Sequence, residues 1–290
     1  METPLKDKWP NCRQFIPIDS FAAPRTKPVK QRSTSRALVV LSILAFGLAG
    51  TATANAQSSV EPYSVSTIAG ATPAIGGDNI SADNALKSPS ALAADRAGNL
   101  FVANTESHTI CKVTPDGLIT TFAGAADSPG YANGVGGAAH LSYPKGVAVD
   151  AAGNVYVADA ANQVIRKITP AGVVSTLAGQ AGLIGNVDGA GSIARFYYPY
   201  GVAVDGAGDV YVADTFNSTI RKITPAGMVS TVAGRAGNIG HADGANSRAS
   251  FNYPSGLAVI VLYFKYGKHE EEFYEKYICL TSHFGRNAES

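Results

Sequence analysis

Short apolar runs separated by turn residues recur along the middle of the chain. Within the stretch that begins at Pro144, these runs are 146–149, 155–158, 164–169 and 173–178. Gly, Asn, Asp and Pro fill the spaces between them, and these residues favour tight turns. Runs this short are typical of strands, and the stretch lacks the period of about 3.6 residues that marks an amphipathic helix. The pattern predicts a meander of four short antiparallel strands.

This four-strand unit repeats without insertions. Prolines open it at positions 89, 144, 199 and 254, each 55 residues after the last. A fixed period of this size indicates a supersecondary unit that stacks on copies of itself. We predict an all-β fold, a partial β-propeller of four-stranded antiparallel blades with a 55-residue repeat, across residues 57–259. Its blades are expected at about 89–124, 144–179 and 199–234, with the start of a further blade at 254–259.

The repeated residues resemble the NHL family of β-propellers, in the version found on bacterial secreted and surface proteins. The copies from 144 and 199 share the core P-x-G-V-A-V-D…G-N/D-V-Y-V-A-D…N…I-R-K-I-T-P-x-G, and the resemblance covers about residues 65–259. It implies a radial scaffold that mostly binds proteins, glycans or RNA, although a few relatives of similar shape are lactonases or lyases. It also implies that a lone strand at 65–69 completes the last blade. Fold alone does not fix function.

The repeat phase ends after Val259. Residues 260–290 form a non-repeat tail that gains Lys, Glu, Tyr and Phe, and Glu270–Tyr277 fits a short helix. A frameshift or gene fusion would produce such a break, so a non-functional, truncated fragment of a longer propeller protein is one alternative. Blades left open in this way expose strand edges and apolar faces at both ends. We therefore expect self-association through the open blade edges.

Residues 1–56 have the order of an export signal. Basic residues lead into the uncharged run Ala37–Gly50, and small residues end at Ala56, before Gln57. Cleavage between Ala56 and Gln57 would remove a secretory signal peptide. The run is shorter than the roughly 20 residues that span a bilayer, but extending it to 37–56 allows an uncleaved helical membrane anchor. Either alternative exports the remainder, which is then periplasmic, at the cell surface, secreted, or anchored in the cytoplasmic membrane.

Charge narrows the classes of partner. The formal net charge is +1 and 16% of residues are charged, so no strong field attracts nucleic acid. We expect a protein or glycan ligand and no nucleic acid.

Carboxylates and arginines recur in phase and suit structural duties. Aspartates follow the first and second strands of each good copy, and an arginine lies in the third strand. They can cap turns or form ion pairs, and the carboxylates can alternatively bind Ca²⁺, which prefers oxygen ligands. We assign turn or pairing roles to Asp150, Asp159, Arg166, Asp205, Asp214 and Arg221. No cofactor is expected, with calcium as the alternative.

Candidate binding residues lie in the connectors and beside the repeated prolines. Asp188 and Asp243 each precede a glycine, which favours a turn, and regularly placed tyrosines can stack on sugars or pack between blades. The candidates are Asp188, Arg195, Asp243, Tyr143, Tyr198 and Tyr253.

Groupings typical of catalysis are scarce. The histidines do not recur in phase, no histidine pair has zinc-ligand spacing, and no G-x-S-x-G elbow is present. We therefore predict no catalytic residue and no metal site. The predicted function is an exported, non-catalytic NHL-type scaffold that binds protein or carbohydrate, with a metal-dependent, lactonase-like hydrolase or lyase as the alternative.

Overall fold

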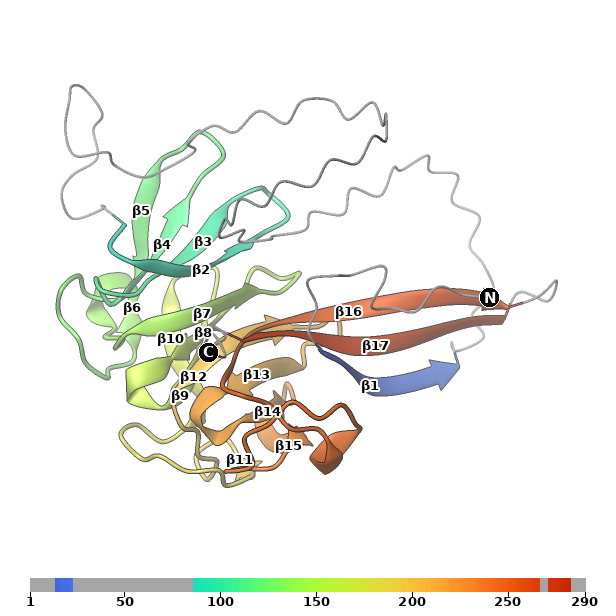
Figure 1. The fold of residues 1–290 in the computed structure, drawn as a ribbon. Helices are drawn as coiled ribbons and strands as arrows, with labels where there is room; N and C mark the ends of the chain where they lie inside the picture. Colours follow the sequence, from blue (N-terminus) through green and yellow to red (C-terminus); the bar gives the residue numbers. More distant parts are fainter. Residues whose placement is uncertain (1–13, 23–85, 267–270, 283–290) are drawn as a thin grey trace, which may run out of the picture. The chain divides into compact units, whose positions relative to one another are not determined.

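The structure is a computed structural model that describes residues 14–22, 86–266 and 271–282 (Figure 1). Within these residues the chain forms strands joined by turns and single-turn 3-10 helices. The strands make four antiparallel sheets, of which one has four strands, two have five and one has three. The all-β prediction is therefore confirmed for the described part of the chain. The segments 37–56 and 65–69 lie outside the described residues.

Three of the sheets are successive copies of the repeat, called blades 1, 2 and 3 here. Blade 1 contains β2 (Pro89–Ala94), β3 (Leu100–Asn104), β4 (Thr109–Val113) and β5 (Ile119–Ala123). Blade 2 contains β7 (Pro144–Val149), β8 (Val155–Asp159), β9 (Val164–Ile168) and β10 (Val173–Gly179). Blade 3 contains β12 (Pro199–Val204), β13 (Val210–Asp214), β14 (Thr219–Ile223) and β15 (Met228–Gly234). The 3-10 helices η3 (Ala160–Asn162) and η4 (Thr215–Asn217) join the second and third strands of blades 2 and 3.

The connectors before blades 2 and 3 add a strand that the sequence did not indicate. β6 (Gly134–Val135), followed by η2 (Gly136–Ala138), pairs with the outer strand β10. β11 (Gly189–Ala190) pairs with β15 in the same way. We expected a turn where Asp188 precedes Gly189, but this connector, like the one before blade 2, adds one short strand to its blade.

Aspartates close the first turn of each blade. The Asp150 carboxylate accepts hydrogen bonds from the backbone N–H groups of Ala152 and Asn154, both at 2.9 Å. Asp205 accepts the equivalent bonds from Ala207 and Asp209, at 2.9 and 3.0 Å. These carboxylates therefore satisfy turn amides within their own blades.

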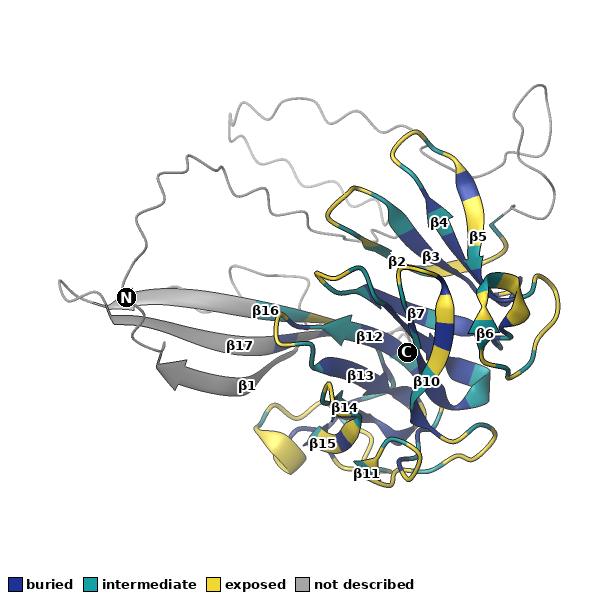
Figure 2. Cartoon of the chain, turned by 180° about the vertical axis from the view of Figure 1, so that it is seen from behind, coloured by how far each residue is buried: buried dark blue, intermediate teal, exposed yellow. Residues whose placement is uncertain are grey.

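Apolar side chains fill the space between neighbouring blades. Between blades 1 and 2, Phe101 and Ile110 pack with Val147 and Val157. A second cluster joins blades 2 and 3, and Figure 2 shows these strands as buried while the loops are exposed. At the first strands the backbones approach closely, because a Cβ on Gly146 would lie 2.2 Å from the carbonyl oxygen of Tyr200. A glycine is what permits this approach.

The fourth sheet corrects two expectations. It has the order β1–β17–β16, with β1 at Gln14–Ala22, β16 at Pro254–Tyr266 and β17 at Glu271–Ser282. The predicted helix at Glu270–Tyr277 is wrong, because all of it from Glu271 onward is strand β17. This segment is rich in aromatic residues, which suit a strand that pairs on both edges. β1 also belongs to this sheet, although the sequence analysis assigned all of 1–56 to an export region.

Residues of the tail cover the outer apolar face of blade 3. Ile278 and Leu280 of β17 are buried in a cluster with Tyr211, Ile220 and Phe251. In blade 1, a further cluster of apolar side chains is also buried; its members are Val102, Cys111, Val113 and Ile119. The expectation of an uncovered apolar face is therefore wrong for blade 3, because the tail supplies apolar residues that pack on it. No helix in the described part of the chain is long and apolar enough to cross a bilayer.

Candidate binding site

Each of blades 2 and 3 holds a fully buried ion pair. Arg166 Nη1 lies 2.9 Å from Asp159 Oδ2, and Arg221 Nη1 lies 2.8 Å from Asp214 Oδ2. All four side chains are 0% exposed. Burial raises the pKa of Asp159 to about 6, although the hydrogen bond from Asn162 and the positive charge of Arg166 lower it. The arginines and aspartates assigned to pairing thus meet inside each blade.

The buried arginines also hold the connectors in place. Arg166 Nη1 donates to the carbonyl oxygen of His140 at 3.1 Å, and Nη2 donates to the carbonyl of Ala132 and to Asn133 Oδ1, both at 2.8 Å. Asp159 reaches the same connector, because its Oδ1 accepts from the N–H of Ser142 at 2.7 Å. The pair therefore fixes the path of the loop that leads into blade 2, so that nearby surface residues are held in place.

Blade 1 replaces both members of the pair by neutral residues. Asn104 and Cys111 stand where Asp159 and Arg166 stand, and Asn104 Nδ2 lies 3.6 Å from Cys111 Sγ. Burial raises the pKa of the Cys111 thiol. The same buried position is therefore filled by a charged pair in blades 2 and 3 and by a neutral pair in blade 1.

Two of the three predicted connector residues, Asp188 and Arg195, form hydrogen bonds within the fold. Asp188 accepts hydrogen bonds from Arg221 Nη2 at 2.6 Å and from the N–H of Thr231 at 3.0 Å. Arg195 Nη1 donates to three neighbouring carbonyl groups, those of residues 192, 193 and 194. Asp243 is exposed in the following connector. Asp188 and Arg195 therefore shape the connector that precedes blade 3, rather than presenting free charge.

Tyr198 and Tyr253 contribute to a cluster of aromatic rings centred on Phe216, called the Phe216 platform here. Phe216 lies on η4 of blade 3, and its ring centroid is within 6.2 Å of four tyrosine rings. These are Tyr197 at 5.3 Å, Tyr198 at 5.3 Å, Tyr200 at 6.2 Å and Tyr253 at 5.4 Å. Phe216 is 36% exposed and Tyr198 is 37% exposed. Five rings from blade 3 and the start of β16 therefore form one partly exposed aromatic surface.

Hydrogen bonds from the preceding blade hold the backbone of Tyr198 and of Tyr143 in a left-handed conformation. Tyr198 adopts a left-handed conformation with φ of 46°, which is unusual for a bulky residue. Its N–H donates to Gln163 Oε1 of blade 2 at 2.6 Å. Tyr143, one repeat earlier, has φ of 49° and donates its N–H to His108 Nδ1 at 3.2 Å. A side chain from the preceding blade thus holds each tyrosine in this strained conformation.

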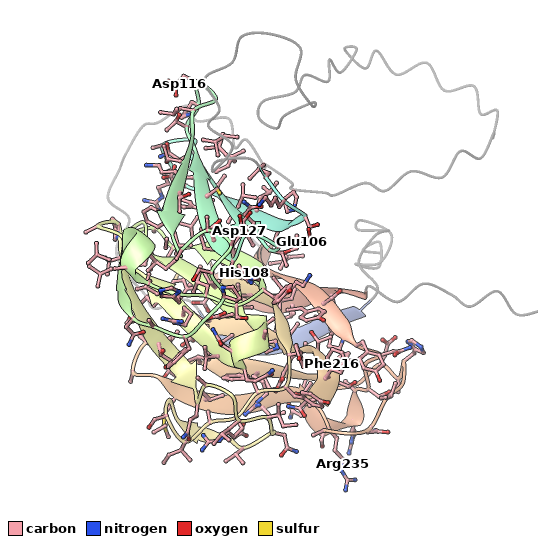
Figure 3. The ribbon with its side chains drawn as sticks, turned by 90° about the vertical axis from the view of Figure 1, so that its left-hand side faces the viewer. Glu106, His108, Asp116, Asp127, Phe216 and Arg235 are labelled. Atoms are coloured by element: carbon pink, nitrogen blue, oxygen red, sulfur yellow. The ribbon has the colours of Figure 1, made fainter. Side chains whose placement is uncertain are left out.

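Tyr143 does not belong to the platform. Its ring packs edge-on against His108, with centroids 4.6 Å apart, and it is 47% exposed. In Figure 3 Phe216 lies apart from Glu106 and His108 of blade 1. The predicted tyrosines therefore divide into two sites, one at the blade 1–2 boundary and one at blade 3.

Lys145 supplies a cation at the edge of the platform. Its Nζ lies 5.9 Å from the ring centroid of Tyr200, the residue one repeat later. Burial raises the pKa of the Tyr200 hydroxyl, and the nearby Tyr198 hydroxyl raises it further. Within the described part of the chain, Lys145 forms no ion pair.

Two further sets of predicted positions remain. Ala56 and Gln57, the expected cleavage site, lie outside the described residues. Among the described residues, no three His, Cys, Asp or Glu side chains group together as metal ligands. Sequence reasoning missed Phe216, for which the one signal was an aromatic residue where blades 1 and 2 carry Glu106 and Ala161.

The repeated four-stranded sheets and their inter-blade packing define this chain as a protein built from β-propeller blades. Residues 129–189 match the family model of the teneurin NHL domain, and residues 196–223 match that of the NHL repeat. The segments 129–189 and 196–223 are therefore NHL-type repeats, as the sequence pattern predicted.

Two curated proteins and one solved structure are among the proteins to which the chain is similar. NHL repeat-containing protein 2 from Bos taurus is 28% identical over 155 residues, which is 49% of this chain and 21% of that protein. Protein SUPPRESSOR OF QUENCHING 1, chloroplastic, from Arabidopsis thaliana is 40% identical over 92 residues, which is 31% of this chain and 9% of that protein. The chain thus spans a minor part of each relative. A Bacteroides thetaiotaomicron protein of unknown function shares the fold, with a TM-score of 0.50 and 23% identity over 65% of this chain and 47% of that one.

Proposed function

We propose that this chain is an exported, non-catalytic NHL scaffold that binds a protein or carbohydrate ligand through the Phe216 platform. The observation that carries the proposal is the gathering of five aromatic rings, two of them more than a third exposed, on loops held by hydrogen bonds between blades. Aromatic side chains supply large contact area with little loss of conformational entropy. Rigid loops lower the ordering cost of binding further.

The repeated polar residues support a scaffold role for the blades. Asp150 and Asp205 satisfy turn amides, and Asp159 and Asp214 are paired with arginines inside the blades. These groups are therefore occupied in building the scaffold rather than available for recognition.

Binding is tested with the full-length chain on arrays of glycans and of envelope proteins. The matched variant is Phe216→Ala, because Ala161 occupies the equivalent position in blade 2. We expect at least one ligand whose signal the variant loses. A ligand bound equally by both proteins, or silence on both arrays, would contradict the proposal.

Export is tested separately. Full-length protein is produced in a bacterial host, and the envelope and cytoplasmic fractions are compared by immunoblot. We expect the chain in the envelope or the medium, with a mature N-terminus at Gln57 if the signal is cleaved or at Met1 if residues 37–56 stay as an anchor. Recovery in the cytoplasm alone would overturn this part of the proposal.

A further inference from the structure

Lys145, at the edge of the Phe216 platform, has no ion-pair partner among the described residues. Lys145 projects from β7 toward the ring of Tyr200 on β12, one blade along. The same position of the repeat holds Ser90 in blade 1 and Ser255 at the start of β16, so this lysine is no requirement of the repeat. A lysine that the blade packing does not need, beside exposed aromatic rings, provides a binding site for an anion.

The rings favour a broad, flat ligand over an inserted side chain. An apolar peptide anchor is usually received by a desolvated pocket. Here the rings pack on one another, with Phe216 at the centre and interplanar angles of 42° to 76°. The rings of Phe216 and Tyr198 remain accessible, and the hydroxyl groups of the platform's tyrosines can donate and accept hydrogen bonds. A pyranose ring matches this surface, because it has an apolar C–H face and a rim of hydroxyl groups.

Resting on the proposed binding function, we propose that the Phe216 platform and Lys145 together bind an acidic oligosaccharide, in which a sugar ring stacks on Phe216 and Tyr198 and its carboxylate contacts the Lys145 ammonium. The contact between carboxylate and ammonium is charge-assisted and salt-sensitive. The stacking contact is largely insensitive to salt.

The ligand pair that tests this is tetragalacturonate and its methyl ester, which keeps the sugar rings and removes the charge. Isothermal titration calorimetry compares both with a hexaglutamate peptide, which keeps the charge and removes the sugars. We expect the methyl ester to bind at least about tenfold more weakly than tetragalacturonate, and the peptide to show no saturable binding. Raising the salt from about 50 mM to about 500 mM should weaken tetragalacturonate binding and leave the methyl ester nearly unchanged.

Two variants copy residues that the chain already tolerates in other blades. Phe216→Ala copies Ala161, and Lys145→Ser copies Ser90. Phe216→Ala should weaken both sugars by about tenfold or more, whereas Lys145→Ser should weaken tetragalacturonate alone. The controls are Tyr143→Ser, which removes an exposed tyrosine outside the platform, and Lys167→Gln, which removes a lysine 5.7 Å from the Tyr156 ring. Both controls should bind as the unaltered chain does.

The outcomes separate this inference from the proposed function. Equal binding of tetragalacturonate and its methyl ester, or binding of hexaglutamate alone, would overturn the acidic-sugar inference and leave a binding platform in place. No sugar binding, together with an array ligand lost in Phe216→Ala, would have the same meaning. Sugar binding that survives Phe216→Ala would overturn both.

Discussion

Replacing Arg166 by cysteine removes the positive charge from a pair in which both side chains are fully buried. Asp159 keeps its bonds from Asn162 and from the N–H of Ser142, but it loses the neighbouring charge. The connector loses its bonds to the guanidinium as well. Cysteine is the chosen replacement because Cys111 fills the equivalent position of blade 1.

The expected cost follows from the burial. Removing one member of a buried ion pair typically destabilises a fold by about 3–5 kcal/mol, because the other charge is left uncompensated. Adding Asp159→Asn recreates the neutral pair of blade 1 and removes that charge. The double variant still lacks the three hydrogen bonds from Arg166 to the connector, each of which contributes about 1 kcal/mol. We therefore expect Arg166→Cys to lower the free energy of unfolding by about 4 kcal/mol, and the double variant to recover about 1 kcal/mol of this.

The assay is urea unfolding followed by circular dichroism, on the unaltered chain, both single variants and the double variant. The double-mutant cycle isolates the coupling between the two positions. A double variant no more stable than Arg166→Cys alone would refute the reasoning, because the buried carboxylate would then not be the source of the cost.

The pH dependence provides a second readout of the same pair. In the folded chain burial raises the pKa of Asp159 to about 6, above the ordinary value of 3.8. The folded state therefore binds a proton that the unfolded state does not bind between these values. Loss of Arg166 raises this pKa further, so above pH 6 only the folded variant gains a proton as the pH falls. The destabilisation of Arg166→Cys relative to the unaltered chain should therefore shrink as the pH falls toward about 6 and stay nearly constant below it. The double variant carries Asn at this position and should show no such change.

Three further changes test other contacts. In the unaltered chain, stability should fall as the pH drops below about 6.5, because burial lowers the His108 pKa and a protonated Nδ1 can no longer accept the Tyr143 N–H. His108→Gln should remove this pH-dependent loss. Thermal melts at about pH 5 and pH 8 check this. Gly179→Ala should cost about 1–3 kcal/mol in urea unfolding, because φ is 97° and the new Cβ would lie 2.7 Å from the Gln163 carbonyl oxygen. Ile278→Ala should cost about 2–5 kcal/mol, and a change near zero would show that β17 does not cover blade 3.

The blades could be predicted because the same physical constraints recur in each copy. All four repeated prolines begin strands, and in every case the pairing shifts register directly after the proline. Buried strands bounded by turn residues leave few alternatives once the period is known. The NHL resemblance then needed no information beyond these recurring positions.

The tail could not be predicted in this way. Glu271–Ser282 mixes charged and aromatic residues, so local propensity left helix and strand open. Its strand state depends on pairing with β16 and with β1, and β1 lies more than 200 residues earlier in the chain. Such long-range pairing is invisible to a local pattern.

The sequence predicted two of the five rings of the Phe216 platform. Tyr198 and Tyr253 were chosen because they recur beside the prolines. Phe216 and Tyr200 were not chosen, because their positions carry different residues in each copy. A residue that differs from its equivalents in the other copies gives no periodic signal. Phe216 and Tyr200 are two such residues, and their rings are in contact in the platform.

The central claim is that the Phe216 platform is the ligand-binding surface. Hydroxyl-radical footprinting with mass spectrometry, with and without the tightest ligand from the arrays, tests it most directly. We predict that bound ligand lowers the oxidation of Phe216 and Tyr198, while Tyr143, which is more exposed and lies outside the platform, is oxidised as before. Unchanged oxidation of Phe216 and Tyr198, with protection elsewhere on the chain, would contradict it.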